Sequence, residues 1–444
     1  MQSHICSIVP PYLLRGIAES QSNDDKARQG ARNCLAHRER VTTKRCERFQ
    51  LLSQPPATRA AANIHRGHRN IVPEVLLQHI ADSGDVDDNT KARARGDIER
   101  TRRVTSAYQK SLKGENVDQP DPKDGGVTAT KAGGKTGDDN TGDDAPPKDP
   151  GSSGFYRAVY DAKHSEDEST LPGDVLRVEG QAAVKDETAN AAFDNVGRVL
   201  EFYLEQFKWK SIDNKNQHVI SSVHFGQAYG NAFWDPEIAQ MVFGDGDDFI
   251  GNFATCIDVI GHELTHAVTE HTSPLNYDAQ PGALNEHVSD VFGIMIKQKY
   301  EDETADKADW LIGEGCLLPG VKGVALRSMK APGTAYDDPR FGKDPQPANM
   351  SDYKPTTDDN GGVHLYSGIP NKAFYLASVA FGGYSWEKAG QIWWKTMSAG
   401  RVPASCTFVQ FADATVDTAE ELFGADAAKT VRDAWNQVGV TRKN

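Results

Sequence analysis

The stretch DVIGHELTHAVTEH at residues 258–271 carries two histidines four positions apart, with a glutamate directly after the first. Residues four apart on an α-helix lie side by side, so His262 and His266 can reach one metal ion. Catalytic zinc takes three protein ligands and keeps one position for water. Glu263 projects to a neighbouring direction that suits a general base acting on that water. The alternative is that two exposed histidines share a helix face by chance.

A third ligand is available in the stretch GALNEHVSDVFG at residues 282–293. Glu286 lies 20 residues after His266 and opens a second amphipathic pattern. Asp290 is one turn further on the same face and can accept the ring N–H of a metal-bound histidine, while Asn285 can orient the other. Alone, this motif is typical of a solvated helix face. Paired with the first motif, it favours a zinc site.

Three regions of different composition must position these residues. Residues 1–113 form an arginine-rich arm with an internal repeat, in which IVPPYLLRGIAES at 8–20 returns as IVPEVLLQHIADS at 71–83. Residues 114–154 are dominated by Gly, Pro, Asp, Lys and Ser, with few large apolar residues, which predicts a disordered linker. The folded body begins at Phe155.

The body has strand-like patterns first and helical patterns afterwards, which predicts an α+β fold. We expect two lobes, a strand-rich N-terminal lobe at residues 155–256 and a mostly helical C-terminal lobe at 257–444, with the histidine helix at their junction. The expected strand-like runs are 218–226 and 239–245, and the expected helices are 190–207, 256–270, 283–300, 371–381, 386–398 and 418–438.

Charge separates the arm from the body. Formal net charge is −14, but residues 1–114 carry 20 Lys+Arg against 12 Asp+Glu, which leaves −22 for the rest. A basic arm could bind nucleic acid, but acidic residues are interspersed in it, and docking on its own acidic body explains the asymmetry as well. We therefore expect no nucleic-acid partner. No apolar run is long enough to span a membrane, so we expect no membrane partner either.

Four stretches together resemble the thermolysin family of zinc metallopeptidases. They are GHELTHAVTEHTSPLNY, GALNEHVSDVFG, LRSM and DNGGVHLYSGIPNKAFYLA, in family order and at family-like spacing within residues 155–444. The resemblance implies a thermolysin-like body and a zinc-dependent endopeptidase with protein or peptide substrates. It implies one catalytic zinc bound by His262, His266 and Glu286, with Glu263 as the base.

The same resemblance assigns further catalytic groups. His364 would donate a hydrogen bond to the carbonyl oxygen as that oxygen gains charge, with Asp359 orienting the ring and Tyr277 assisting. Fixed donors at this oxygen lower the barrier of amide hydrolysis by several kcal/mol, which is the physical reason for such a group. An isolated histidine is more often structural, but glycines at 361 and 362 allow close backbone approach to a cleft.

Substrate-binding residues follow from the resemblance too. Asn231 and Ala232 would pair with an extended substrate backbone, although a buried strand end is a competing interpretation. Arg327 would bind a substrate carbonyl, with a surface ion pair as the alternative. Val259 and Leu326 would line an apolar pocket, which implies cleavage before bulky apolar residues.

The chain departs from the family at its paired-calcium site. Asp258, Asp309 and Glu314 stand where acidic ligands belong, but Lys297 and Leu311 replace two others. Calcium requires six to eight oxygen ligands, and an ammonium group among them repels it. We expect at most one calcium ion, with Lys297 acting as a built-in cation.

The start of the arm, CSIVPPYLL, resembles the short propeptide of the protealysin-like branch. The resemblance implies a latent precursor in which the arm is an intramolecular inhibitor, and it favours secretion of a monomer. The segment ICSIVPPYLL is too short and proline-rich for a signal peptide, which keeps a cytoplasmic location as the alternative. Cys6 could cap the zinc through its thiolate, or it could be an ordinary free cysteine.

One competing interpretation is a catalytically silent metal-binding relative whose duplicated arm is an interaction module. Glu263 and His364 argue against it, because a silent protein has no physical need for either group.

Overall fold

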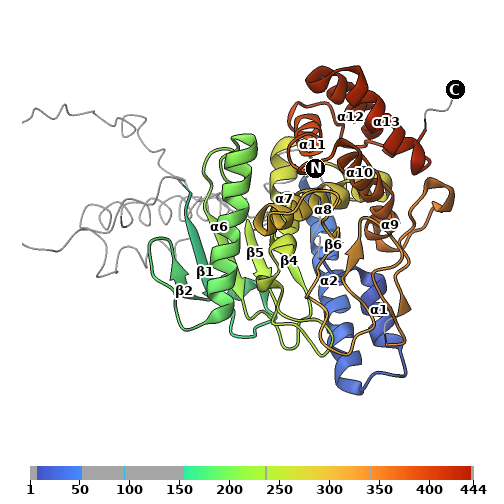
Figure 1. Cartoon of the computed structure of the whole chain (residues 1–444). Helices are drawn as coiled ribbons and strands as arrows, with labels where there is room; N and C mark the ends of the chain where they lie inside the picture. Colours follow the sequence, from blue (N-terminus) through green and yellow to red (C-terminus); the bar gives the residue numbers. More distant parts are fainter. Residues whose placement is uncertain (1–7, 53–94, 96–154, 236–237, 341, 442–444) are drawn as a thin grey trace, which may run out of the picture. The chain divides into compact units, whose positions relative to one another are not determined.

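The computed structural model describes residues 8–52, 95, 155–235, 238–340 and 342–441 (Figure 1). The chain divides into one compact unit of residues 1–49 with 152–444 and a second of residues 50–151. Cys6, the second copy of the repeat and the expected linker at 114–154 lie outside the described residues.

A five-stranded sheet forms the N-terminal lobe, with strand order β2-β1-β3-β5-β4. The central strands β1, β3 and β5 run parallel, and β2 and β4 pair antiparallel to them at the two edges. The strands are β1 (Arg157–Asp161), β2 (Asp174–Val178), β3 (Val219–Val223), β4 (Ala232–Asp235) and β5 (Gln240–Phe243). Because β4 is an edge strand, one side of its backbone is available to another extended segment.

The first long helix of the body, α6 (Glu187–Phe207), covers this sheet (Figure 1). Asp186 caps its start by accepting a hydrogen bond from the Ala189 N–H, which satisfies one of the unpaired donors of the first turn. The face that carries Phe193, Val196 and Tyr203 is buried.

Two helices, α7 (Ile257–Thr272) and α8 (Ala279–Glu301), pass side by side through the centre of the unit (Figure 1). Glycine allows their close approach. A Cβ atom at Gly293 would lie 2.6 Å from the Asp258 carbonyl oxygen, and one at Gly261 would lie 2.9 Å from Cδ1 of Ile296. Real Cβ atoms do not approach that closely, so a side chain at either position would push the two helices apart.

The C-terminal lobe is mostly helical, as expected. It contains α9 (Asp359–Tyr366), α10 (Gly368–Phe381), α11 (Ala389–Ser398), α12 (Phe408–Phe423) and α13 (Ala425–Gln437). The prediction of one helix over 418–438 is wrong, because Gly424 adopts φ 84° and separates α12 from α13. Four two-residue strands, β6 (Leu311–Ile312), β7 (Arg327–Ser328), β8 (Asp337–Asp338) and β9 (Gly342–Lys343), form two small sheets.

The described part of the arm packs on the body. It consists of α1 (Pro11–Glu19) and α2 (Asp25–Leu52), drawn in blue in Figure 1. Ile8, Val9, Leu14 and Ile17 are each 0% exposed and belong to the same continuous apolar core as the body. The expectation that the basic arm docks on its own acidic body is therefore confirmed for this segment.

Cysteine pairing was not anticipated from the sequence. Cys256 and Cys316 form a disulfide across 60 residues, and Cys34 and Cys406 are buried thiols. Among the described residues, no helix combines the length and apolarity that crossing a bilayer would require.

Candidate active site

The three expected metal ligands come together from two helices. His262 and His266 project from α7 and Glu286 from α8, with their ligand atoms all within 4.8 Å of one another. The Nε2 atoms of the two histidines are 3.1 Å apart. One carboxylate oxygen of Glu286 lies 3.5 Å from Nε2 of His262, and the other lies 3.7 Å from Nε2 of His266. All three residues are buried, so the alternative of two exposed histidines is wrong.

Neighbouring acceptors fix both imidazole rings. Nδ1 of His262 lies 2.8 Å from Oδ1 of Asp290, and Nδ1 of His266 lies 2.8 Å from Oδ1 of Asn285. Because these oxygens only accept, each Nδ1 carries the proton and donates it, which leaves a lone pair on each Nε2. Two such lone pairs facing across 3.1 Å repel unless a proton or a metal ion lies between them. Two imidazoles and an adjacent carboxylate match the ligand preference of zinc, so these residues fit that ion.

Glu263 faces away from the ligand set towards the edge strand. Its Oε2 accepts a hydrogen bond from the backbone N–H of Trp234 at 3.0 Å. Its Oε1 is buried and makes no hydrogen bond within the part of the chain that the structure describes. Burial raises the pKa of Glu263 to about 8. A buried carboxylate oxygen of this kind is suited to a water molecule as its partner.

A second group of side chains adjoins Glu286. His364 lies on α9, and its Nδ1 is 2.8 Å from Oδ1 of Asp359, whose Oδ2 also accepts the His364 backbone N–H at 2.9 Å. The His364 Nε2 atom is 3.4 Å from the hydroxyl oxygen of Tyr277 and 3.5 Å from Glu286. The Tyr277 hydroxyl donates to the other carboxylate oxygen of Glu286. The left-handed backbone at Gly361 and its neighbours folds Asp359 back onto the histidine.

The residues expected to bind substrate contact the arm instead. Asn231 Oδ1 accepts the Val9 N–H at 3.1 Å, and the Ala232 carbonyl accepts the Ile8 N–H at 3.3 Å. Arg327 donates from NH1 to the Ile8 carbonyl oxygen at 2.9 Å. The start of the arm therefore contacts the first residue of the edge strand β4, Ala232, and the residue before it, Asn231.

Arg327 is held from its other side by Asp290, at 3.0 Å from Nε and 2.7 Å from NH2. It is 1% exposed, so the alternative of a surface ion pair is wrong. Although burial raises it, Arg327 and His262 hold the pKa of Asp290 well below its usual value. Val259 and Leu326 are fully buried.

A second arm contact reaches the His364 group. Arg38 of α2 donates from NH2 to Oδ1 of Asp359 at 3.1 Å, the same oxygen that His364 contacts. Both side chains are largely buried. The residue directly before Arg38, His37, lies 2.8 Å from a carboxylate oxygen of Glu168 in the N-terminal lobe.

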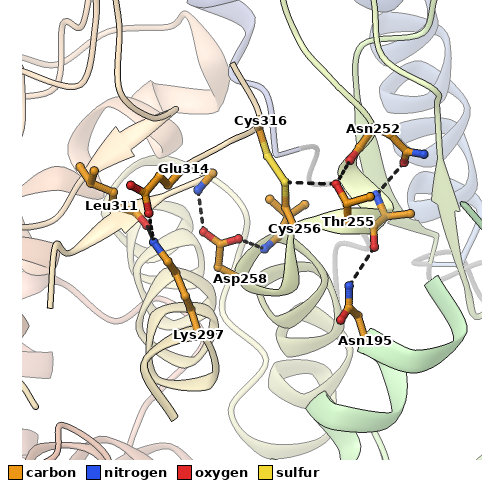
Figure 2. The surroundings of a disulfide bond; sticks show 12 residues. Asn195, Asn252, Thr255, Cys256, Asp258, Lys297, Leu311, Glu314 and Cys316 are labelled. Carbon is orange, nitrogen blue, oxygen red and sulfur yellow. Dashed lines mark hydrogen bonds and ion pairs between the residues drawn. A yellow bond between two sulfur atoms is a disulfide. The ribbon is translucent and has the colours of Figure 1, made fainter. Parts of the chain in front are cut away.

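The expected calcium cluster holds a lysine ammonium group at its centre (Figure 2). The Nζ atom of Lys297 lies 2.9 Å from Asp309 and 2.6 Å from Glu314, and 3.5 Å from the Leu311 carbonyl oxygen. Asp258 accepts backbone N–H groups at both carboxylate oxygens, including that of Gly313. Figure 2 also places the Cys256–Cys316 disulfide at the start of α7, beside this cluster.

Sequence reasoning missed a further set of buried polar side chains behind the metal ligands. Asn371, His287 and Trp393 form a hydrogen-bonded series that ends on Asp290. The signal for them was weak, because Asn371 stands beside Lys372 in a mostly apolar stretch and belongs to no spacing pattern, and His287 directly follows a ligand.

The fold and this ligand set are those of a zinc-dependent metallopeptidase whose own N-terminal segment contacts Asn231, Ala232 and Arg327. The family described as "Thermolysin metallopeptidase, catalytic domain" matches residues 143–270, and "Thermolysin metallopeptidase, alpha-helical domain" matches 273–440. The family "Protealysin propeptide" matches residues 6–47. The chain belongs to the thermolysin family of metallopeptidases and is a precursor form with a protealysin propeptide.

Named relatives agree with this assignment. "Protease PrtS" of Photorhabdus sp. (strain Az29) is 47% identical over 314 residues, which cover 70% of this chain and 82% of that protein. The "Extracellular metalloprotease" of Pectobacterium carotovorum subsp. carotovorum is 47% identical over 64% of this chain and 81% of its own length. The solved structure "Precursor of Protealysin, Metalloproteinase from Serratia proteamaculans" is 42% identical, with a TM-score of 0.63 over 83% of this chain and 99% of that one.

Proposed function

We propose that this metalloendopeptidase binds one zinc ion through His262, His266 and Glu286 and uses Glu263 as its general base. The observation that carries the proposal is the convergence of the three ligand atoms within 4.8 Å while Asp290 and Asn285 accept the outer ring protons. When bound, zinc supplies a Lewis acid that polarises the scissile carbonyl and acidifies water beside it.

Glu263 moves the proton in both halves of the reaction. Its Oε1 takes a proton from the attacking water as the water oxygen bonds to the carbonyl carbon. Glu263 then delivers that proton to the amine nitrogen as the C–N bond breaks, so the carboxylate is regenerated. The Trp234 N–H holds the other oxygen of Glu263 in place throughout.

Tyr277 and His364 act on the carbonyl oxygen. Asp359 accepts the Nδ1 proton of His364, and a proton on Nε2 makes that nitrogen the donor towards the oxygen that becomes negative. The Tyr277 hydroxyl lies 3.4 Å from that nitrogen, so both donors can serve the same oxygen. The His364 ring is already fixed by Asp359, whereas the Tyr277 hydroxyl, which donates to Glu286 in this structure, turns from that carboxylate to the carbonyl oxygen.

Substrate lies where the arm now lies. Asn231, Ala232 and Arg327 bind the substrate backbone, and in the precursor they contact the backbone of Ile8 and Val9. Ile8 is bulky, apolar and fully buried beside Arg327, which supports cleavage before residues of that type. The arm is thus an intramolecular inhibitor, because it fills the strand-pairing edge and the arginine that a substrate needs.

The Lys297 ammonium group neutralises Asp309 and Glu314, so the chain binds at most one calcium ion. Two of the matched relatives carry "extracellular" in their names, which supports secretion of this protein. We propose a monomer that has neither nucleic-acid nor membrane partners.

Digestion of casein by the activated protein tests the mechanism. Glu263→Gln keeps the shape of the side chain and removes the base, so we expect the rate to fall by roughly 10²–10⁴-fold with zinc still bound. A zinc chelator should abolish the wild-type rate, and added zinc should restore it. Proteolysis that survives both treatments would remove Glu263 and zinc from the reaction.

A further inference from the structure

Asp290 is the point at which two functions of the site meet. Its Oδ1 accepts from His262 Nδ1 at 2.8 Å and from Arg327 NH2 at 2.7 Å. Its Oδ2 accepts from Arg327 Nε at 3.0 Å and from Asn371 Nδ2 at 2.8 Å. All four side chains are 1% exposed or less. The position of this one carboxylate therefore sets both a metal ligand and the arginine of the cleft.

The hydrogen bonds continue from Asn371 into the helical lobe. Oδ1 of Asn371, on α10, lies 2.8 Å from Nδ1 of His287, on α8. Nε2 of the same ring lies 2.8 Å from Nε1 of Trp393, on α11. Three separate helices thus contribute to one buried polar series, and each of these side chains is at most 1% exposed.

The Trp393 indole fixes the donor and the acceptor of every hydrogen bond in the series. An indole N–H can only donate, so Nε2 of His287 must be the acceptor and its proton must be on Nδ1. That N–H then donates to the Asn371 carbonyl oxygen, which leaves the Asn371 amide group facing Asp290. A flipped amide would set its carbonyl oxygen against the carboxylate and its NH₂ against an N–H.

We infer that Asn371, His287 and Trp393 are positioning residues that hold Asp290 in place and thereby fix the tautomer and the orientation of His262. With Asp290 held as an acceptor, the His262 proton stays on Nδ1 and the lone pair on Nε2 points towards His266 and Glu286. Outer partners of this kind typically change metal affinity 10–100-fold when they are removed. The inference rests on the proposed role of His262 as a zinc ligand.

Two substitutions break the series at different places. Asn371→Leu keeps the size of the side chain and removes both of its hydrogen bonds, and we expect zinc affinity to fall 10–100-fold. Trp393→Phe keeps an aromatic ring and removes only the N–H, which lets the His287 proton move to either nitrogen. We expect a smaller loss of zinc affinity from this variant, because Asn371 still contacts Asp290.

A matched control lies in the same lobe. Trp435 is also fully buried, stacks on Trp393, and donates from Nε1 to the Thr415 hydroxyl at 2.9 Å. Trp435→Phe removes an equivalent hydrogen bond outside the series. It should lower the melting temperature about as much as Trp393→Phe does, without changing zinc affinity or the His262 tautomer.

The experiment measures zinc affinity by chelator competition, and the ring tautomers of His262 and His287 by ¹⁵N NMR of the metal-free full chain at a pH above the raised pKa of His262, where that ring is neutral. We expect a single Nδ1–H tautomer at both rings in the wild type, a mixture at His287 in Trp393→Phe, and a mixture at His262 in Asn371→Leu. Unchanged zinc affinity and an unchanged His262 tautomer in Asn371→Leu would overturn the inference, as would an equal loss of affinity in Trp435→Phe. A wild-type chain that binds no zinc would instead overturn the proposed function.

Discussion

At the scale of single residues, the site depends on ionisable groups that lie in or beside buried space. Glu263 has a carboxylate oxygen directed into buried space, and Asp290 is surrounded by three donor side chains. Lys297 supplies the positive charge for two acids beside the start of α7. In each place the loss of one partner leaves the other in an environment that disfavours an unpaired charge.

Replacing Lys297 tests the built-in cation. Lys297→Met keeps the length of the side chain and leaves Asp309 and Glu314 without their ammonium partner. Those acids are partly exposed, so we expect a loss of about 1–3 kcal/mol in the free energy of unfolding, below the range for a fully buried pair. Urea unfolding at pH 7 measures it.

Calcium gives the complementary test. Lys297→Glu places a fourth carboxylate beside Asp258, Asp309 and Glu314, so millimolar calcium should raise the melting temperature of this variant. The same calcium concentration should leave the melting temperature of the wild type unchanged, because Lys297 occupies this cluster. A rise in the wild type that disappears in Lys297→Met would contradict the assignment.

At the scale of elements, the start of helix α6 depends on His224, which contacts the capping residue Asp186. His224, next after β3, lies 2.9 Å from Asp186, which caps α6, and 2.7 Å from Asp245. Burial lowers the pKa of His224, but its hydrogen bonds to Asp186 and Asp245 outweigh burial and raise it above the usual value. Its contribution to stability is complete below about pH 6.5 and is lost as pH rises through the raised pKa.

We therefore expect the stability of the wild type, relative to His224→Gln, to decrease as pH rises above about 6.5. Glutamine can hydrogen-bond but does not titrate, so the difference between the two proteins isolates the imidazole. Thermal unfolding across that interval measures it. A difference that grows with pH has the opposite sign and would show that His224 is stabilising in its neutral form.

One residue of the arm helix α2, Arg38, contacts the His364 group through Asp359. Arg38→Gln removes the cation that contacts Asp359, so the arm should dissociate more readily from the cleft and the intact precursor should show roughly tenfold more activity. Arg28→Gln is the matched control, because Arg28 pairs with Asp25 of the same helix. Peptide hydrolysis by freshly purified precursor measures both. Equal activity of the two variants would show that Arg38 does not hold the arm.

Helical spacing explains how much of the site could be predicted. His262 and His266 are one turn apart, as are Glu286 and Asp290, so these faces follow from the sequence alone. The contact between Asn371 and His287 spans 84 residues, and the Cys256–Cys316 pair spans 60, so both depend on how helices and loops pack. The break at Gly424 was missed because apolar spacing continues on both sides of it.

At the scale of the whole molecule, the arm and the body form one packed unit within the described residues. The body's fold, class and metal site could be predicted because their motifs are long and ordered along the chain. For the arm, the sequence predicts that it docks on the body. Its contacts with Arg327 and Asp359 depend on side chains more than 300 positions away.

The most direct test of the account is the zinc content of purified protein after exhaustive dialysis. We predict one zinc ion per chain in the wild type and in Glu263→Gln, since the base is not a ligand, and loss of that zinc in Glu286→Ala. Full zinc retention in Glu286→Ala, or none in the wild type, would contradict a metal centre shared by α7 and α8.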